Sequence, residues 1–266
     1  MQPSRTLTVL ILIVCSPLVQ AGVVMDMVTR DAAGQETDRA KIYAQSKMIR
    51  MDQGGSGSIA SMIFLGDRFI YVDHRDKSYI VMDEAMLNDV SSKISDAMKE
   101  MEAQLANMPP EQRAMVEQMM KGRMNGMMGE QGGSSREPKV ESMGNAKWQS
   151  YSCRQYEVFE GSQKTQEVCA AKLDDVAGAD EVIEAFVGMA AYIKKMTESM
   201  PMMKNDGLNP GELMEKIDGF PVHTVDYSNG KVLREMSLDS VSEQELDRDM
   251  FAAPKNYRRQ DPLGPR

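Results

Sequence analysis

The chain has 266 residues, of which 42% are apolar and 27% are charged, which is typical of a globular protein. Its 40 acidic and 31 basic side chains give a formal net charge of −9, so a nucleic-acid-binding protein is not expected. Methionine is unusually abundant, at 26 positions, whereas histidine occurs only at His74 and His223.

Residues 1–21 have the pattern of a secretory signal peptide. Arg5 precedes an apolar run over residues 7–14, and Ala21 is the small residue expected before the cleavage site. That run is too short to cross about 30 Å of hydrocarbon. Cys15 leaves a lipoprotein as the rival hypothesis, although the residue before it is not small. We therefore expect a periplasmic protein without a stable membrane span.

Short β-prone segments separated by turn residues fill residues 22–82. Segments of this kind predict an antiparallel meander. Several of them alternate in polarity with period two, as Val24, Asp26 and Val28 do. This alternation predicts that one face of the sheet is buried and the other is wet.

A helical period of three to four begins after residue 82, so residues 83–128 are predicted to form a helical insertion or lid. Pro109 and Pro110 end the first helix and suit the start of a second one, which reaches about Met128. The Gly-rich residues 129–138 predict a flexible linker. The apolar stripe of the first helix comprises Leu87, Val90, Ile94, Met98, Met101, Leu105 and Met108.

Cys153 and Cys169 lie in two β-prone runs joined by a turn-like segment whose midpoint is Gly161. A regular hairpin turning there would place the two cysteines opposite each other, at a spacing that a disulfide bridges. The alternative, a redox or metal-binding pair, normally has a CxxC spacing. We predict a structural disulfide, which agrees with export to an oxidising compartment.

A further helix and a hairpin follow the cysteines. The turn Ser228-Asn229-Gly230 joins two alternating strands and predicts a hairpin. The terminal segment that follows is predicted to pack against the fold and to fray over residues 259–266. Together these elements predict one domain over residues 22–258. The apolar stripe of the helix comprises Val182, Phe186, Met189, Ile193, Met196 and Met200.

The sequence contains no GxSxG, HExxH, GxxxxGK[ST] or GxGxxG signature. His74 and His223 lie in strand-like contexts, where a structural histidine is the simpler interpretation. We therefore predict no catalytic, cofactor-binding or metal-binding residue, and an enzyme with an unrecognised site remains an alternative.

Nine of the 31 residues from Met98 to Met128 are methionine, and three interpretations stay open. Methionine fills cores, and it also forms adaptable apolar surfaces for an acyl chain or a partner peptide. Thioethers further bind Cu(I), for which the candidates are Met119, Met120, Met124, Met127 and Met128. The candidate lid over an apolar ligand comprises Met98, Met101, Leu105, Met108, Met189, Ile193 and Met196.

Several segments resemble a bacterial envelope family, domain of unknown function 4412. They are KMIRMD, FIYVDHRDKSYIVMD, the cysteine hairpin and the stretch from GFPVHTVDYSNGK to FAAPKNY. That family is similar to the lipoprotein-carrier (LolA/LolB-like) superfamily. The resemblance implies an α+β fold, in which a curved antiparallel half-barrel sheet has the Met-rich helices packed over its concave face.

The resemblance also implies a function. It points to a non-enzymatic periplasmic protein that binds a lipid, an acyl chain or a lipidated or hydrophobic partner, and it brings no catalytic residues with it. The alternative is a Met-rich copper-binding or oxidant-scavenging protein.

Overall fold

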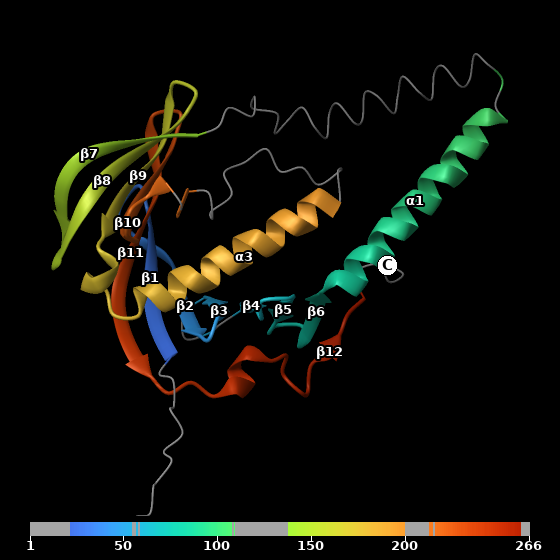
Figure 1. Cartoon of the computed structure of the whole chain (residues 1–266), viewed down its shortest axis with the longest axis horizontal. Coiled ribbons are helices and arrows are strands. Elements are labelled where there is room, and N and C mark those ends of the chain that lie inside the picture. The colour runs from blue at the N-terminus through green and yellow to red at the C-terminus, as the bar shows by residue number, and fades with distance from the viewer. Residues whose placement is uncertain are drawn as a thin grey trace, which may run out of the picture.

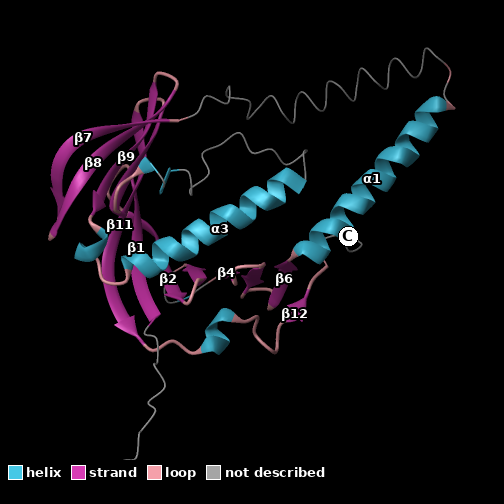
Figure 2. Ribbon diagram, viewed as in Figure 1, coloured by secondary structure: helices cyan, strands magenta, loops and turns pink. Residues whose placement is uncertain are grey.

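The fold is that of a computed structural model of the whole chain. The structure describes residues 22–54, 57, 59–107, 109, 138–199, 213–214 and 216–261. Within this part the protein is α+β, with one large, mostly antiparallel sheet that does not close and two long helices (Figures 1 and 2). The predicted signal peptide, second helix and linker lie outside the described residues, apart from single residues at their borders.

The elements follow one another in two blocks. The first block consists of β1 (Gly22–Asp31), β2 (Glu36–Gln45), β3 (Met48–Gln53), β4 (Ala60–Phe64), β5 (Phe69–Asp73), β6 (Ser78–Met82) and α1 (Glu84–Ala106). The second consists of β7 (Lys139–Trp148), β8 (Tyr151–Glu160), β9 (Gln163–Ala171), the 3-10 helix η2 (Leu173–Asp175), α3 (Ala179–Ser199), β10 (Phe220–Ser228), β11 (Lys231–Gln244), the 3-10 helix η4 (Arg248–Phe251) and β12 (Arg258–Arg259).

The sheet has the order β12-β6-β5-β4-β3-β2-β1-β11-β10-β9-β8-β7. The predicted meander over β1 to β6 is confirmed, and β7 to β11 contribute the other half. The two halves join where β1 pairs with β11, from Gly22 opposite Gln244 to Asp31 opposite Arg234. Among the described strands, only β12 and β6 pair in parallel. Strand β11, near the C-terminus, thus pairs with the first strand, β1, and the two halves form one continuous sheet.

Helix α3 lies in the bend of the sheet, with β7 to β11 on one side and β2 to β6 on the other (Figure 1). Its predicted apolar stripe is confirmed as far as Met196, and Met200 lies outside the described residues. Val182 and Met189 are buried, and Phe186, Ile193 and Met196 pack against the same core. Burial of such a stripe supplies most of the stability of a helix in a globular protein. The main core therefore lies between α3 and the inner face of the sheet.

The opposite face of the first six strands is also covered in part, which corrects the expectation that the whole face is wet, although Arg39 and Lys41 on it stay partly exposed. Val24, Ile70 and Val72 are buried there under the C-terminal segment, which contributes Leu246 and Phe251. Strand β1 is consequently buried on both faces near its start, where three apolar residues follow one another. A strand in this position needs a continuous apolar run and not an alternating one.

Helix α1 departs from the expected packing. Asp83 caps its first turn, where a side-chain oxygen accepts a hydrogen bond from the Met86 backbone N–H at 2.9 Å. Leu87 is buried and Val90 is half-buried, but the middle of the stripe is open, with exposed fractions of 45% at Met98 and 37% at Met101. Figure 1 shows α1 running away from the sheet. Helix α3 covers only part of the inner face, since Met62 and Tyr71, on the same face as Phe64 and Phe69, keep exposed fractions of 37% and 38%.

Two predicted turns are found. Asn229 and Gly230 both have positive φ, 52° and 73°, as the tight Asn-Gly turn requires. In the cysteine hairpin Glu160 pairs with Gln163, so the loop has two residues.

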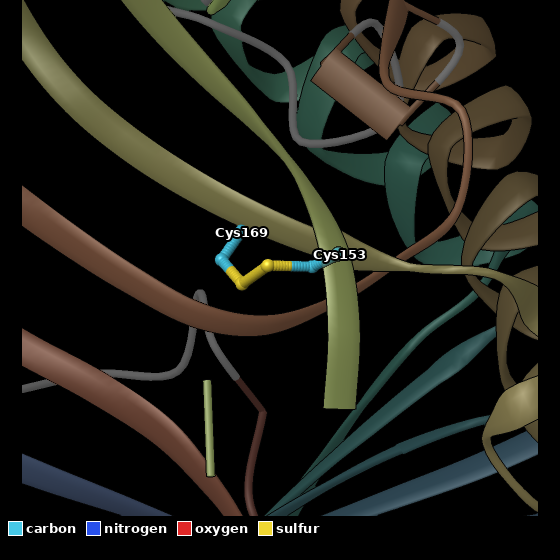
Figure 3. The surroundings of a disulfide bond; sticks show 2 residues. All are labelled: Cys153 and Cys169. Carbon is cyan, nitrogen blue, oxygen red and sulfur yellow. A yellow bond between two sulfur atoms is a disulfide. The ribbon is translucent and has the colours of Figure 1, made fainter. Parts of the chain in front are cut away.

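The disulfide between Cys153 and Cys169 is confirmed, but its position in the hairpin differs from the expected one (Figure 3). An irregularity next to Val158 shifts the register, so that Cys153 pairs with Ala171 and Cys169 pairs with Gln155. The cysteines are therefore diagonal neighbours, with their Cα atoms 5.5 Å apart. This spacing is within the range that a disulfide requires.

The C-terminal segment stays attached beyond the expected boundary at residue 258. Arg259 belongs to β12, and the backbone N–H of Gln260 donates to the Tyr79 carbonyl at 2.8 Å. The side-chain amide of Gln260 also donates to Ser78 Oγ at 2.9 Å. These bonds to the edge of β6 hold residues that the sequence offers no reason to order.

Replacing both Cys153 and Cys169 with Ser should lower the free energy of unfolding by about 3 kcal/mol. The disulfide closes a loop whose ends are 16 positions apart, and its loss restores the conformational entropy of the unfolded chain. Denaturant unfolding of the oxidised protein and of the double variant measures this difference. Equal midpoints, or free thiols in the folded oxidised protein, would contradict the assignment.

Candidate ligand-binding surface between α1 and α3

The first turns of α1 and the last turns of α3 meet in a small cleft. Its volume is about 70 Å³, which is well below the roughly 300 to 1,000 Å³ of pockets that bury small ligands. The cleft is therefore too small to bury a ligand by itself. Its lining consists of Glu84, Leu87, Asn88 and Ser91 from α1 and of Tyr192, Lys195 and Met196 from α3.

Polar contacts hold the two helices together at this cleft. Lys195 Nζ lies 3.4 Å from Glu84 Oε2, and the Tyr192 hydroxyl donates to the Met82 carbonyl at 3.4 Å. Burial raises the pKa of Tyr192, and the nearby carboxylate of Asp83 adds to that effect. The phenol therefore stays neutral and acts as a hydrogen-bond donor. The first contact joins α3 to the start of α1 and the second joins α3 to the end of β6, so they fix only one end of α1.

Tyr192 also belongs to an aromatic cluster under α3. Its ring centroid lies 5.8 Å from that of Phe64 and 5.6 Å from that of Phe69, and these two rings are 4.9 Å apart. Separations of this size are favourable for aromatic pairs. The wall of the cleft on the α3 side is therefore rigid, because its central side chain is part of the main core.

The apolar stripe of α1 continues outward from the cleft. From Leu87 to Leu105 it spans about 27 Å at 1.5 Å per residue. The exposed fraction is 8% at Leu87 and rises to 40% at Ile94. The start of the stripe thus packs against α3 at the cleft. Further along α1, no described element covers the stripe.

The predicted lid residues fall into two groups. Met98, Met101 and the half-buried Leu105 lie on the outward part of α1, and Met108 lies outside the described residues. Met189, by contrast, is buried in the main core. Ile193 and Met196 are half-buried on α3 and pack against this core. The structure thus places the α3 members in the wall and the α1 members on the open stripe.

The predicted copper-binding methionines, from Met119 to Met128, lie outside the described residues, so that hypothesis stays a prediction. In the part of the chain that the structure describes, no group of three or more His, Cys, Asp or Glu side chains is arranged to hold a metal ion.

Each histidine has side-chain partners. His74 Nε2 lies 2.7 Å from Ser61 Oγ, and its Nδ1 lies 3.0 Å from the Tyr257 hydroxyl. This arrangement joins the β4–β5 region to the C-terminal segment, as a structural histidine would.

His223 belongs to a second cluster, in which it contacts one aromatic ring and one carboxylate. Its ring stacks on Trp148, with 3.5 Å between centroids and 6° between planes, and its Nε2 lies 2.8 Å from Glu235 Oε1. The indole N–H of Trp148 is buried without a hydrogen-bond partner among the described residues. The stack links β7 to β10 across the two strands between them.

A charged group lies beside this stack. Lys164 contacts Glu157 at 3.2 Å and also pairs with Glu167, and its ammonium lies 4.5 Å from the Tyr227 ring centroid. Burial alone would raise the pKa of Glu167, but hydrogen bonds from Lys164 and Tyr227 outweigh it, and the pKa is lowered. A lowered pKa means that the folded state favours the ionised carboxylate.

Replacing Glu167 with Gln should reduce the dependence of the free energy of unfolding on pH at acidic pH. The lowered pKa contributes stability that is fully present above the unfolded value of about 4.3 and is lost as the pH falls through the folded value. We expect a loss of about 0.5 kcal/mol at neutral pH and a smaller loss below pH 4. Thermal unfolding at several pH values measures it. The control is Glu243→Gln, at an exposed position of β11, and a parallel loss in both variants would contradict this account.

Sequence reasoning missed part of the cleft. It identified the stripe with Leu87 but not Tyr192, because the predicted α3 stripe passes through Ile193, although Tyr192 is also three residues from Met189 and four from Met196. The alternation of apolar and polar residues also did not predict that Trp148 of β7 stacks on His223 of β10, because the two strands are not neighbours in the sheet.

The chain belongs to the family described as Domain of unknown function (DUF4412), which matches residues 83–257. This match confirms the family part of the resemblance stated above. No curated protein matches the chain.

Solved structures align with low sequence identity. An uncharacterized conserved protein from Thermus thermophilus aligns with a TM-score of 0.46 at 10% identity, over 91% of each chain. PNGF-II aligns with a TM-score of 0.40 at 10% identity, over 91% of this chain and 31% of the other. The MucA/MucB complex of Pseudomonas aeruginosa aligns with a TM-score of 0.38 at 8% identity, over 89% and 56%.

Two further observations concern the compartment. The Cys153–Cys169 disulfide indicates an oxidising environment. Among the described residues, neither helix is both long and apolar enough to cross a bilayer.

Proposed function

We propose that this protein is a non-enzymatic binding protein of the periplasm that holds an acyl chain, as part of a lipid or a lipidated partner, against the stripe of α1. The observation that carries the proposal is the exposure of Ile94, Met98 and Met101 on one side of a helix whose first turn is packed. Exposure of an apolar stripe to water is unfavourable in free energy. Binding of a ligand that covers the stripe is favoured by about 25 cal/mol per Å² of buried apolar surface.

The size of the surface fits one acyl chain. A chain in one leaflet spans about half of the 30 Å hydrocarbon core of a bilayer, or roughly 15 Å. The stripe from Leu87 to Leu105 is longer than that, at about 27 Å. Methionine suits such a site, because its unbranched side chain adapts to the occupant at small cost.

The packing places α1 beside α3 at the cleft and not over the bent sheet (Figure 1), so the acyl chain is proposed to lie between the two helices. Helix α3 already fills the bend, and its half-buried Met196 faces the cleft. A chain entering between the helices would contact Tyr192 and Met196 on one side and the α1 stripe on the other. The ligand then covers the exposed part of the α1 stripe.

The double variant Met98→Lys, Met101→Lys should bind dansyl-labelled undecanoic acid at least tenfold more weakly than the parent. Lysine is a good helix former, so α1 remains helical, but two charges then interrupt the apolar stripe. Because both positions are exposed, the melting temperature should stay within a few degrees. Fluorescence titration and circular dichroism measure the two effects.

The matched control is Val232→Lys, Leu233→Lys, which makes the same chemical change at exposed apolar positions of β11, with exposed fractions of 39% and 57%. This control should bind the probe like the parent. Equal weakening in both variants, or a parent that does not bind the probe, would contradict the proposal and favour a protein partner for the stripe.

Backbone amides of α1 beyond Ser91 should exchange hydrogen much faster than those of β1 and β11. Few buried contacts hold this part of α1, whereas each of the two strands is hydrogen-bonded to a neighbouring strand on both sides. Undecanoic acid should slow the exchange in α1 selectively, because a ligand stabilises the state that binds it. Exchange in α1 as slow as in β1, and unchanged by the fatty acid, would mean that the stripe is not a binding surface.

A further inference from the structure

A second hollow lies on β7, β8 and β9, at the other end of α3 from the cleft. Its volume is about 580 Å³, large enough for a small ligand. Three cations and two polar side chains dominate its lining, which also includes the small residues Ala146, Cys153 and Ala170. The cations are Lys147, Arg154 and Lys172, and the polar side chains are Asn145 and Ser152.

The strand register explains why these cations gather. Lys147 pairs with Ser152, and Asn145 pairs with Arg154, so all four residues share one face of the β7–β8 ladder. Arg154 in turn pairs with Ala170 of β9. Lys172 follows the end of β9 in extended conformation, which carries it beside the same face. Since strands lie about 4.8 Å apart, the three cations border an area about 10 Å wide.

None of these three cations forms an ion pair among the described residues, although other cations of the same half of the sheet do. Lys164 is paired with Glu157 and Glu167, and Arg234 lies 2.6 Å from Asp226. Like charges on neighbouring strands destabilise a sheet. The chain as a whole carries a charge of −9, so a group of such cations is not a result of its composition.

Two carboxylates, Asp175 and Asp218, also line the hollow, so its lining carries a net charge of +1. A single negative charge balances this sum, and the guanidinium of Arg154 suits an oxyanion because it donates two parallel hydrogen bonds. Ser152 and Asn145 add neutral donors at the same place. The carboxylates can accept hydrogen bonds from hydroxyl groups of the same ligand.

We propose that this hollow binds a phosphate diester that carries hydroxyl groups, whether as a free compound or as the headgroup of a lipid. Arg154 and the two lysines hold the phosphate, and Asp175 and Asp218 accept hydrogen bonds from the hydroxyls. The proposal uses no residue of the α1 stripe, so it stands or falls separately from the function proposed above.

The test measures binding of three probes to the full chain by calorimetry at constant ionic strength. They are inorganic phosphate, glycerophosphoglycerol and dihexanoylphosphatidylglycerol. The variant Lys147→Gln, Arg154→Gln, Lys172→Gln should weaken binding of glycerophosphoglycerol at least tenfold. The matched control Lys93→Gln, Lys99→Gln, Lys255→Gln removes the same charge at exposed, ion-paired lysines and should leave the affinity within twofold.

The outcomes separate the sources of the phosphate. Glycerophosphoglycerol binding as tightly as the short-chain lipid indicates a free diester, and much tighter binding of the lipid indicates a headgroup with its chains. Binding that falls equally in both variants, that prefers inorganic phosphate to both diesters, or that is absent in the parent overturns the proposal.

A stability measurement serves as a second readout. Without ligand at low salt, the hollow variant should melt at the same temperature as the parent or higher, because it removes repulsion between like charges. Glycerophosphoglycerol should raise the melting temperature of the parent and of the control, but not that of the hollow variant. A ligand-induced shift that survives in the hollow variant would place the site elsewhere.

Discussion

The pairing of β1 with β11 is the constraint on which the rest of the structure depends. It joins the first described strand to one near the end of the chain, over ten residue pairs, and so makes two meanders into one sheet. Both faces near this junction are buried, by α3 on the inner side and by the C-terminal segment around Phe251 on the other. The bend that receives α3 exists only because the two halves are joined here.

The exposure of α1 follows from that same arrangement. Two helices carry apolar stripes, but only α3 packs on the inner face, where its small buried residues Ala179 and Ala185 allow close approach to the sheet. Helix α1 starts directly after the edge region of β6 and contacts the fold through its first turn. No described element covers the middle of its stripe.

Much of the fold could be predicted from the sequence, because local periodicity reports secondary structure directly. It located α1, α3 and the meander, and the Asn229-Gly230 turn was predictable because both residue types tolerate positive φ. Periodicity reports which residues share a face, but not whether the fold has a surface for that face, so the packing of Met98 could not be predicted. The run Val23-Val24-Met25 did contain the signal of a strand buried on both sides.

The disulfide and the cation-lined hollow show what register adds to periodicity. Cys153 and Cys169 could be paired from their spacing alone, because the diagonal and the direct arrangements are both within reach of a disulfide. The irregularity next to Val158 has no clear sequence signal, yet it decides which residues face each other. Without that register, Arg154 and Lys172 are two unrelated exposed cations, and the acidic total charge of the chain gives no reason to look for them.

The two candidate sites lie at opposite ends of α3. Asp175 of the hollow is four residues before Ala179, whereas the cleft begins at Tyr192, about 20 Å further along the helix. Between them α3 is packed against the sheet, with Val182 and Ala185 fully buried, so it has no alternative arrangement that binding at one end could select. Coupling between sites requires an element with two states that both sites bias. Helix α1 is open to such a change but does not reach the hollow, so binding at the two sites should be energetically independent. A ligand that occupies the hollow should therefore leave hydrogen exchange in α1 unchanged, and a shift in that exchange would show that the sheet itself responds to binding.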